Sequence, residues 1–264
     1  MKAWIYLSPH FDDVALSCGG LVWQQAQAGD PVGIWTICGG DVPEGPLSPF
    51  AHSLHDRWQT GREAARQRRE EDIAACQWLG ADYRHFLLAD CIYRRYPGDE
   101  EDRAGFFPYA SEESLFGPLH PVETGLVAQL GEQLARAFPS EAEILCPLAL
   151  GGHVDHRLTR LAAENLQRSL WYYADYPYVL NDKGHPENLT QSGWKGVKFD
   201  LSEGGMAAWE RSVAAHASQI STFWPDLGAI CQALRDYRLQ MQGVILWRPP
   251  KKDLSELALT KESC

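Results

Sequence analysis

The sequence predicts an α/β fold built on a mostly parallel sheet with helices on both faces. Two observations support this fold class. Short apolar segments alternate with helical segments along almost the whole chain, which is the pattern of repeated βαβ units. In addition, segments such as PVGIWTIC (31–38) and EILCPLAL (143–150) are almost continuously apolar, as expected for strands that a parallel sheet buries on both faces.

The strands are placed by their short apolar runs and by the turn-forming residues that follow them. The predicted strands cover residues 3–8, 31–38, 83–89, 143–150, 169–179, 195–201 and 243–250. The predicted helices cover residues 14–28, about 58–79, 122–138, a segment within 151–167, and about 203–241 with a break near Pro225. Gly80 supports the end of the 58–79 helix, because glycine is favoured just after a helix C-terminus.

The 264 residues contain no internal repeat, low-complexity tract or clear interdomain linker. We therefore expect one domain over residues 1–264, with elaborated loops at about 40–57, 90–120 and 180–196. Long loops of this kind are usually functional or mobile. The polar C-terminal tail, 251–264, is expected to be frayed.

Composition argues against several kinds of protein. The formal net charge is −11, from 35 acidic residues against 24 Lys and Arg, so nucleic acid and anionic lipid are poor default partners. No apolar run approaches the ~20 residues that a membrane span requires. The N-terminus lacks the apolar segment of a signal peptide.

The cysteines point to a reducing compartment. There are seven of them, an odd number, scattered along the chain without a CxxC pair, and several lie in apolar runs. This pattern favours buried, reduced thiols in a cytoplasmic protein over a disulfide framework. The oligomeric state, including a homo-oligomer, is left open by the sequence.

A first candidate site lies in LSPHFDDVALSCGG (7–20), directly after the first predicted strand. In open α/β sheets, ligands bind at the carboxyl ends of the strands. His10 and Asp13 are three residues apart and offer the nitrogen and oxygen donors that suit zinc or another divalent transition ion. Asp12 would then be free to act as a general base towards water. The alternative is that one of the two aspartates merely caps the following helix.

A second candidate site lies in GGHVDHRLT (151–159), which also follows an apolar strand and opens a helix. Catalytic zinc typically takes three protein ligands and leaves one position open. His10 and Asp13 make such a set with either His153 or His156. The remaining histidine could stabilise a tetrahedral oxyanion, and Asp155 could orient that histidine.

Both segments resemble motifs of one family. SPHFDD, followed by ALSCGG, resembles the (P)HxDD motif of the PIG-L/LmbE-like N-acetylglucosaminyl deacetylases, and GGHVDHRLT resembles their HxDH motif. ARQRREEDIAACQWLGA with FLLADC resembles the family's R-x-x-E helix and the strand after it, and AAWERSVAAHASQ resembles a late helix ending in His-x-Ser-Gln. The resemblance runs from about Leu7 to Gln219. Phe11 departs from the commonest form of the first motif, which has proline there.

The resemblance implies a Rossmann-like fold and one divalent metal ion, usually Zn²⁺. By resemblance, the metal ligands are His10, Asp13 and His156. Residues 91–120 match no part of the family pattern, so the sequence does not identify the substrate.

The resemblance also implies roles for further residues. Asp12 would be the general base, and His153 would polarise the oxyanion while Asp155 holds it. Arg68 and Asp90 match positions that contact sugar hydroxyls or the phosphate-bearing part of family substrates. Either Asp12 or His153 would protonate the leaving amine.

The expected function is that of a zinc-dependent hydrolase that removes the N-acetyl group from an N-acetylglucosamine-type sugar conjugate and releases acetate. Aromatic residues in WYYADYPY, in the 90–120 loop and at Trp58 are candidates for stacking on a sugar ring, and His55 could join the pocket rim. The alternatives are a metal-dependent amidohydrolase acting on a non-sugar N-acyl compound, a binding protein with a structural metal, and a nucleotide-binding domain. The last is disfavoured because no GxGxxG occurs.

Overall fold

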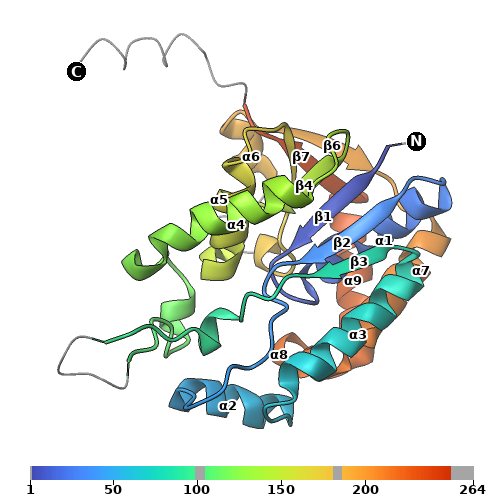
Figure 1. The fold of residues 1–264 in the computed structure, drawn as a ribbon. Helices are drawn as coiled ribbons and strands as arrows, with labels where there is room; N and C mark the ends of the chain where they lie inside the picture. The colour runs from blue at the N-terminus through green and yellow to red at the C-terminus, as the bar shows by residue number, and fades with distance from the viewer. Residues whose placement is uncertain (1, 99–104, 181–185, 251–264) are drawn as a thin grey trace, which may run out of the picture.

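One seven-stranded sheet forms the centre of the computed structural model, which describes residues 2–98, 105–180 and 186–250. Along the sheet the strand order is β3-β2-β1-β4-β5-β7-β6 (Figure 1). The strands are β1 (Trp4–Ser8), β2 (Val32–Thr36), β3 (Asp82–His85), β4 (Glu143–Pro147), β5 (Leu170–Tyr173), β6 (Lys195–Phe199) and β7 (Val244–Arg248).

The first five strands of the chain are mutually parallel, whereas β7 pairs antiparallel with β5 and β6 pairs antiparallel with β7. The predicted mostly parallel sheet is therefore confirmed. The chain passes outward from β1 to β2 and β3, and then returns to place β4 on the other side of β1. This reversal makes the carboxyl ends of β1 and β4 a topological switch point, the usual ligand position in such sheets.

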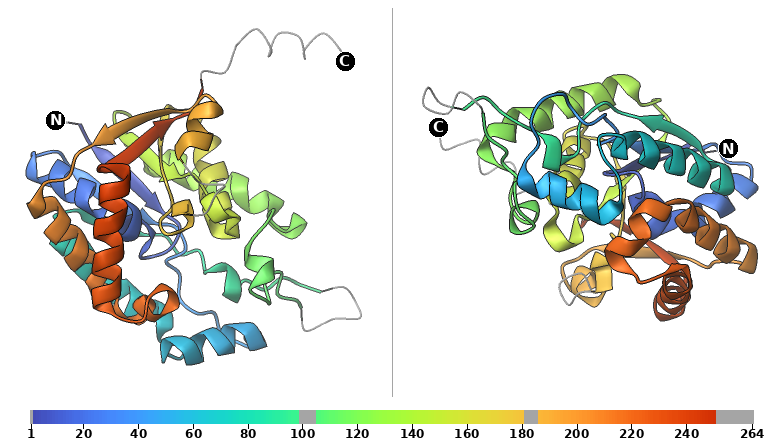
Figure 2. Two further views of the ribbon diagram at one scale, coloured as in Figure 1. Left: turned by 180° about the vertical axis from the view of Figure 1, so that it is seen from behind. Right: turned by 90° about the horizontal axis from the view of Figure 1, so that it is seen from below.

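Helices cover both faces of the sheet, as Figures 1 and 2 show. On one face α4 packs against α5, and on the other α7 packs against both α1 and α3. The helices are α1 (Asp13–Gln27), α2 (Pro49–Trp58), α3 (Ala64–Leu79), α4 (Thr124–Ala137), α5 (Val154–Glu164), α6 (Pro186–Gln191), α7 (Glu203–Ala215), α8 (Ala217–Phe223) and α9 (Leu227–Met241).

The Gly19-Gly20 pair explains how closely α1 approaches α7. A Cβ atom at Gly19 would lie 2.7 Å from Cδ1 of Trp209, and one at Gly20 would lie 2.9 Å from a methyl group of Leu201. The indole nitrogen of Trp209 donates to the carbonyl oxygen of Ala15, at 2.7 Å. These glycines therefore serve helix packing and do not form a phosphate-binding turn.

The helix expected over 58–79 corresponds to α3, and a separate helix, α2, precedes it. Residues 49–57 were expected to lie in the 40–57 loop, but with Trp58 they form α2. Ser48 caps this helix by accepting the Ala51 amide, and Pro49 occupies its first turn. Gln59 then adopts a left-handed conformation (φ 53°) that ends α2, and α3 starts only at Ala64. The predicted end of this region at Gly80 is confirmed, with φ 68° at the glycine.

Other boundaries also differ from expectation. The third strand ends at His85 rather than at residue 89, and the predicted 203–241 helix is divided into α7, α8 and α9. The break near Pro225 is confirmed, since Asp226 caps α9 by accepting the Ala229 amide, but a second break at His216 was not predicted. Within the expected 180–196 loop, residues 186–191 form α6, and 181–185 lie outside the described residues, as does the 251–264 tail.

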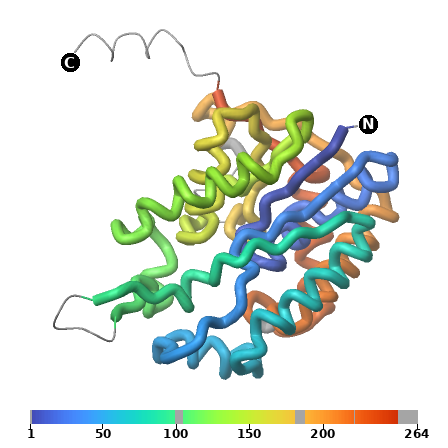
Figure 3. The backbone as a smooth tube through the Cα atoms, viewed as in Figure 1, coloured from blue at the N-terminus to red at the C-terminus, as the bar shows by residue number. Residues whose placement is uncertain are grey.

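A second, smaller apolar cluster lies beside the main core and packs the chain that follows β3 against α2. Its buried members are Leu47, Ala51, Leu54, Cys91, Ile92, Tyr93, Tyr109 and Val154. The smooth backbone trace in Figure 3 shows this outer part of the molecule extending beyond the carboxyl ends of the strands. The cluster thus holds α2 and the segment after β3 in place beyond the switch point.

The six cysteines in the described part of the chain are all free, and five of them are buried. This agrees with the expectation of reduced thiols; Cys264 lies outside the described residues. Among the helices of residues 2–98, 105–180 and 186–250, none combines the length and the apolar character needed to cross a membrane.

Candidate active site

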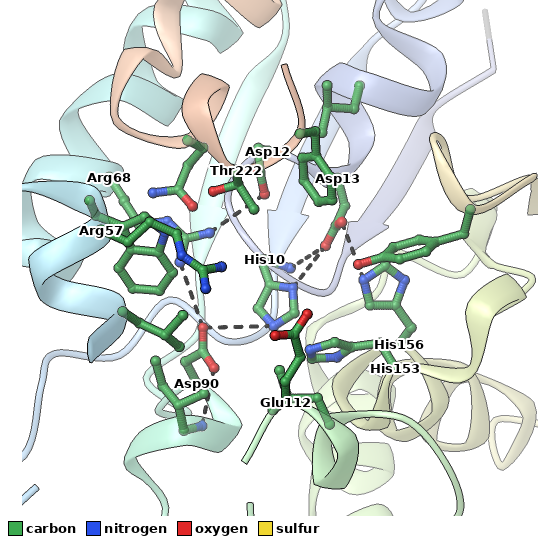
Figure 4. A pocket seen from close by; sticks show the side chains of 18 of the residues that line it. His10, Asp12, Asp13, Arg57, Arg68, Asp90, Glu112, His153, His156 and Thr222 are labelled. Atoms are coloured by element: carbon green, nitrogen blue, oxygen red, sulfur yellow. Dashed lines mark hydrogen bonds and ion pairs between the residues drawn. The ribbon is translucent and has the colours of Figure 1, made fainter. Parts of the chain in front are cut away.

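The two predicted motifs meet at the switch point. His10, Asp12 and Asp13 lie where β1 passes into α1, and His153 and His156 lie where β4 passes into α5, so adjacent parallel strands carry both motifs to one edge of the sheet. Figure 4 shows these side chains converging on one pocket, which they line together with Arg68 and Asp90. The structure therefore brings seven of the eight predicted site residues to one pocket wall; the eighth, Asp155, is fully buried directly behind them.

Asp13 lies between two imidazole rings. One carboxylate oxygen is 3.2 Å from Nδ1 of His10, and the other is 3.2 Å from Nε2 of His156. The His10 backbone amide also donates to Asp13, at 2.7 Å, which fixes the carboxylate at the start of α1. These three side chains consequently place one imidazole nitrogen beside each oxygen of a single carboxylate.

Each of these imidazoles has a second carboxylate behind it. Nε2 of His10 donates to Oδ2 of Asp155 at 3.1 Å, and Nδ1 of His156 donates to Oδ1 of Asp175 at 2.6 Å. A histidine that binds a metal through one nitrogen almost always donates from the other to a carboxylate, carbonyl or water, and this fixes its tautomer. The donor set and its supporting carboxylates therefore fit a zinc ion.

A three-histidine set is also geometrically available, because His10, His153 and His156 bring ring nitrogens within 4.8 Å of one another. The surroundings of His153 differ, however. Its Nδ1 accepts a hydrogen bond from the Asp155 backbone amide at 3.2 Å, and within the described residues no carboxylate hydrogen-bonds to the ring. His10, Asp13 and His156 are therefore the better-supported donor set.

The Asp155 side chain does not hold His153, which the sequence had suggested. Its carboxylate bonds His10, the Cys91 amide and Arg94, and only its backbone amide reaches the ring of His153. The reason is that His10, the Cys91 amide and Arg94 already occupy both oxygens of the Asp155 carboxylate.

The charges of the cluster follow from burial and from close ion pairs. Burial disfavours charge on His156, but Asp13 and Asp175 outweigh burial and raise its pKa to about 10. Burial likewise opposes charge on His10, yet Asp90, Asp13 and Asp155 together raise its pKa well above the ordinary value. The two imidazoles hold the pKa of Asp13 well below its usual range, against the effect of burial. The pocket is thus built to hold positive charge.

The pKa of His153, unlike that of His10 and His156, is lowered. Burial, followed by the neighbouring His10 and His156, lowers its pKa to about 3, so the ring is neutral at pH 7. Because Nδ1 accepts from the Asp155 amide, the proton of the neutral ring lies on Nε2. His153 is therefore a neutral hydrogen-bond donor that lines the pocket.

Asp12 is the acid that the donor set does not use. It occupies the N-cap position of α1, but its side chain makes no capping hydrogen bond, which argues against the simple capping role. Its carboxylate lies 3.5 Å from Arg68, and the other end of the guanidinium lies 3.6 Å from Asp90. Arg68 is itself held between the rings of Phe11 and Trp58.

The pocket has a volume of about 370 Å³, within the ordinary range for small-molecule sites. Trp58 lines it, as the sequence suggested, together with Tyr178 and the apolar residues Phe116 and Phe223. His55 does not line the pocket but is buried and bonded to the hydroxyl of Tyr93, 2.7 Å away.

The 90–120 aromatic residues are mostly anchors rather than pocket residues. Tyr93 and Tyr109 are buried in the second apolar cluster, and Tyr96 and Tyr109 bond Glu123. Of the aromatic residues in this segment, Phe116 lines the pocket, whereas Tyr93, Tyr96, Phe106, Phe107 and Tyr109 do not.

The geometry agrees with a comparison against protein families. The model of the family PIG-L, described as GlcNAc-PI de-N-acetylase, matches residues 5–166, which include both motifs. The chain belongs to the PIG-L family.

Two curated relatives are named as deacetylases. A 2'-N-acetylparomamine deacetylase of Niallia circulans is 27% identical over 220 residues, which are 75% of this chain and 74% of that protein. A 2'-N-acetylparomamine deacetylase of Streptomyces fradiae is 30% identical over 184 residues, 66% of this chain. The match spans only 57% of the length of the second relative.

Solved structures support the PIG-L fold. The zinc-inhibited form of teicoplanin deacetylase Orf2 superimposes with a TM-score of 0.78 at 24% identity, covering 93% of this chain and 97% of that one. The A40926 pseudoaglycone deacetylase Dbv21 gives a TM-score of 0.68 at 25% identity, covering 94% and 96%. The Rossmann-like PIG-L architecture thus extends over nearly the whole chain.

Several residues of this PIG-L site were not predicted. Asp175, behind His156, follows β5 in the aromatic run WYYADYPY, of which only the aromatic residues were predicted to line the pocket. Gln219, Arg57 and Glu112 also line the pocket. The R-x-x-E and His-x-Ser-Gln resemblances pointed to Gln219. Glu71 of the first motif accepts hydrogen bonds from the backbone amide and the hydroxyl of Ser218 in the second, beside Gln219.

Proposed function

We propose that this protein is a zinc-dependent N-deacetylase that hydrolyses the N-acetyl group of an N-acetylglucosamine-type sugar conjugate. The observation that carries the proposal is the position of Asp13 between His10 and His156 while Asp12 stays outside the donor set. Membership of the PIG-L family and the deacetylase names of the relatives support the reaction type.

In this proposal His10, Asp13 and His156 hold the metal, for which zinc is the favoured ion and another divalent transition ion the alternative. A bound zinc ion supplies Lewis-acid activation of a carbonyl group or a water molecule. The protein orients the ligands: Asp155 holds the imidazole of His10 and Asp175 holds that of His156 before any ion binds.

Asp12 is proposed to take the proton from the attacking water. Its carboxylate lines the pocket beside the donor set, and Arg68, 3.5 Å away, keeps it oriented. The water oxygen forms the new bond to the acetyl carbon, and the C–N bond of the amide then breaks. The products are acetate and the free amine.

His153 is proposed to donate from Nε2 to the oxyanion that develops on the acetyl oxygen. A neutral imidazole donates a hydrogen bond well but is a very weak acid, so it does not readily give up that proton. Asp12, which has just received the proton of the water, is therefore the better donor to the leaving amine.

The pocket and the relatives support the proposed substrate class. Trp58 and Tyr178 offer flat faces to a sugar ring, and Arg68 and Asp90 offer polar contacts to its hydroxyl groups. The Niallia and Streptomyces relatives are named for an N-acetylated amino sugar derivative. We also propose a reducing, cytoplasmic location, because the six described cysteines are free.

The test measures acetate release from N-acetylglucosamine conjugates, from 2'-N-acetylparomamine and from N-acyl amides without a sugar. Zinc-loaded protein should hydrolyse the amino-sugar substrates, and chelation should stop the reaction. Asp12→Asn should bind zinc normally and lose turnover by at least about 100-fold, as expected for removal of a general base. Preferential hydrolysis of the sugar-free amides would favour the amidohydrolase alternative, and wild-type turnover by Asp12→Asn would remove the base assignment.

A further inference from the structure

Arg94 lies outside every recognised motif, yet it is buried and bonds directly to Asp155. Its Nη1 donates to Oδ1 of Asp155 at 2.6 Å, and the Arg94 side chain is only 5% exposed. Nη1 also donates to the Ala89 carbonyl oxygen at 3.2 Å, which ties the guanidinium to the chain just after β3. Arg94 therefore occupies one oxygen of Asp155 and leaves the other to different partners.

Glu123, directly before α4, holds the opposite side of the same guanidinium. Nε of Arg94 donates to Oε1 at 2.6 Å and Nη2 donates to Oε2 at 3.0 Å, which is the two-bond geometry of a strong arginine–carboxylate pair. The hydroxyl groups of Tyr96 and Tyr109 each donate to Glu123 at 2.9 Å. Glu123 is completely buried, so this carboxylate has no solvent to replace these bonds.

The unit ends on His10. The second oxygen of Asp155, Oδ2, accepts from the Cys91 amide at 3.0 Å and from Nε2 of His10 at 3.1 Å. Because Nε2–H is engaged with Asp155, Nδ1, which faces Asp13, is the nitrogen that His10 would offer to a metal ion. A continuous series of charge-assisted bonds thus runs from Glu123 through Arg94 and Asp155 to the ring.

The unit of Glu123, Arg94 and Asp155 carries a net negative charge. Arg94 carries one positive charge between the two carboxylates of Glu123 and Asp155. Arg94 alone would neutralise Asp155. Because Glu123 adds a second carboxylate, the three side chains behind His10 keep one net negative charge. This arrangement favours a cation on the far side of the ring.

We propose that Arg94 and Glu123 are positioning residues for the metal site, acting through Asp155 on His10. The inference rests on the proposed function for the identity of the metal ligands. It gives the otherwise unmatched segment after Asp90 a defined task, since that segment delivers Arg94 to the back of the site and its tyrosines brace Glu123.

The experiment measures zinc affinity by competition against a chelator at 25 °C, with kcat and KM measured in parallel. Arg94→Met keeps the length of the side chain but removes every bond to the two carboxylates. It should weaken zinc binding by about 10–100-fold, the usual effect of losing an outer partner of a metal-binding histidine. Arg94→Lys should recover part of the affinity, and kcat should fall more than KM rises.

Leu130→Ala is the matched control for general destabilisation. Leu130 is buried in α4, the helix that Glu123 precedes, and belongs to the main core rather than to this unit. This variant should lower Tm and leave zinc affinity at 25 °C within 2-fold of wild type, as roughly expected for a core change that touches no metal-binding group. If Arg94→Met does not fold, Glu123→Gln, which preserves shape, provides the same test with a smaller loss of affinity in the same direction.

The outcomes separate this inference from the proposed function. Unchanged zinc affinity in folded Arg94→Met, or an equal loss in Leu130→Ala, would overturn the positioning role. Zinc binding without acetate release from any substrate would refute the deacetylase function and leave the positioning role standing. A wild-type protein that does not bind zinc would overturn both.

Discussion

Asp13 lies 3.2 Å from Nδ1 of His10 and 3.2 Å from Nε2 of His156, so one carboxylate bridges the two motifs. Removing its charge by Asp13→Asn, or removing a nitrogen donor by His156→Ala, should abolish stoichiometric zinc binding. Metal analysis of the purified variants after dialysis checks this. Glu132→Gln, on the exposed face of α4, is a charge-matched control that should retain a full equivalent of zinc. A full equivalent in Asp13→Asn would rule out this donor set.

Asp175 is buried behind His156 and accepts from its Nδ1 at 2.6 Å. Asp175→Asn keeps the shape of the side chain but removes the charge that fixes the imidazole. We expect zinc affinity to fall by about 10–100-fold while the fold is retained. Competition titration gives the affinity and circular dichroism gives the fold. Wild-type affinity in the folded variant would show that the His156 ring needs no carboxylate partner.

The zinc affinity should increase with pH above pH 7. Despite burial, Asp13 and Asp175 raise the pKa of His156 to about 10, so at pH 7 and without zinc the ring is positively charged and holds a second proton, on Nε2. Because zinc must displace that proton, apparent affinity should rise with pH from 7 towards 10 rather than levelling off above about 6.5, the ordinary histidine pKa. Calorimetry in buffers with different ionisation heats would detect the released proton. A pH-independent affinity above pH 7 would contradict the prediction.

His153 should act without binding the metal. His153→Ala is expected to keep zinc and to lose about 10²–10³-fold in kcat, the typical cost of one oxyanion donor. Burial and the two neighbouring histidines hold the pKa of His153 at about 3, so its ring should stay neutral from pH 5 upward, which ¹⁵N NMR can detect. Loss of zinc from His153→Ala would instead indicate the three-histidine set.

The contact between α1 and α7 gives a test of the fold. Gly19→Ala would place a methyl group 2.7 Å from the buried Trp209, and overpacking of this kind should cost about 1–3 kcal/mol of unfolding free energy. Gly125→Ala, in α4 with open space around its Cβ position, should be neutral or stabilising by up to about 1 kcal/mol. Urea unfolding measures both. Equal stabilities would mean that α1 can move away from α7 at little cost.

Secondary structure was predicted best where residues within a short segment determine it. The alternation of apolar strands with helices gave the sheet, and Gly80 gave the end of α3. The helix at Pro49–Trp58 was missed although its Ser-Pro start is a recognisable signal, because the surrounding Gly and Pro residues suggested a loop. The break at His216 had no such local signal.

The sequence by itself determined which side chains stand at the ends of β1 and β4, because a motif that joins a strand to a helix is encoded within about ten consecutive residues. Only the tertiary structure decided how those side chains pair. It assigned Asp155 to His10 rather than to His153, Asp175 to His156, and Arg94 with Glu123 to the back of the site. These partners are separated by 19 to 145 positions along the chain, and strand order and packing, which no local spacing encodes, bring them together.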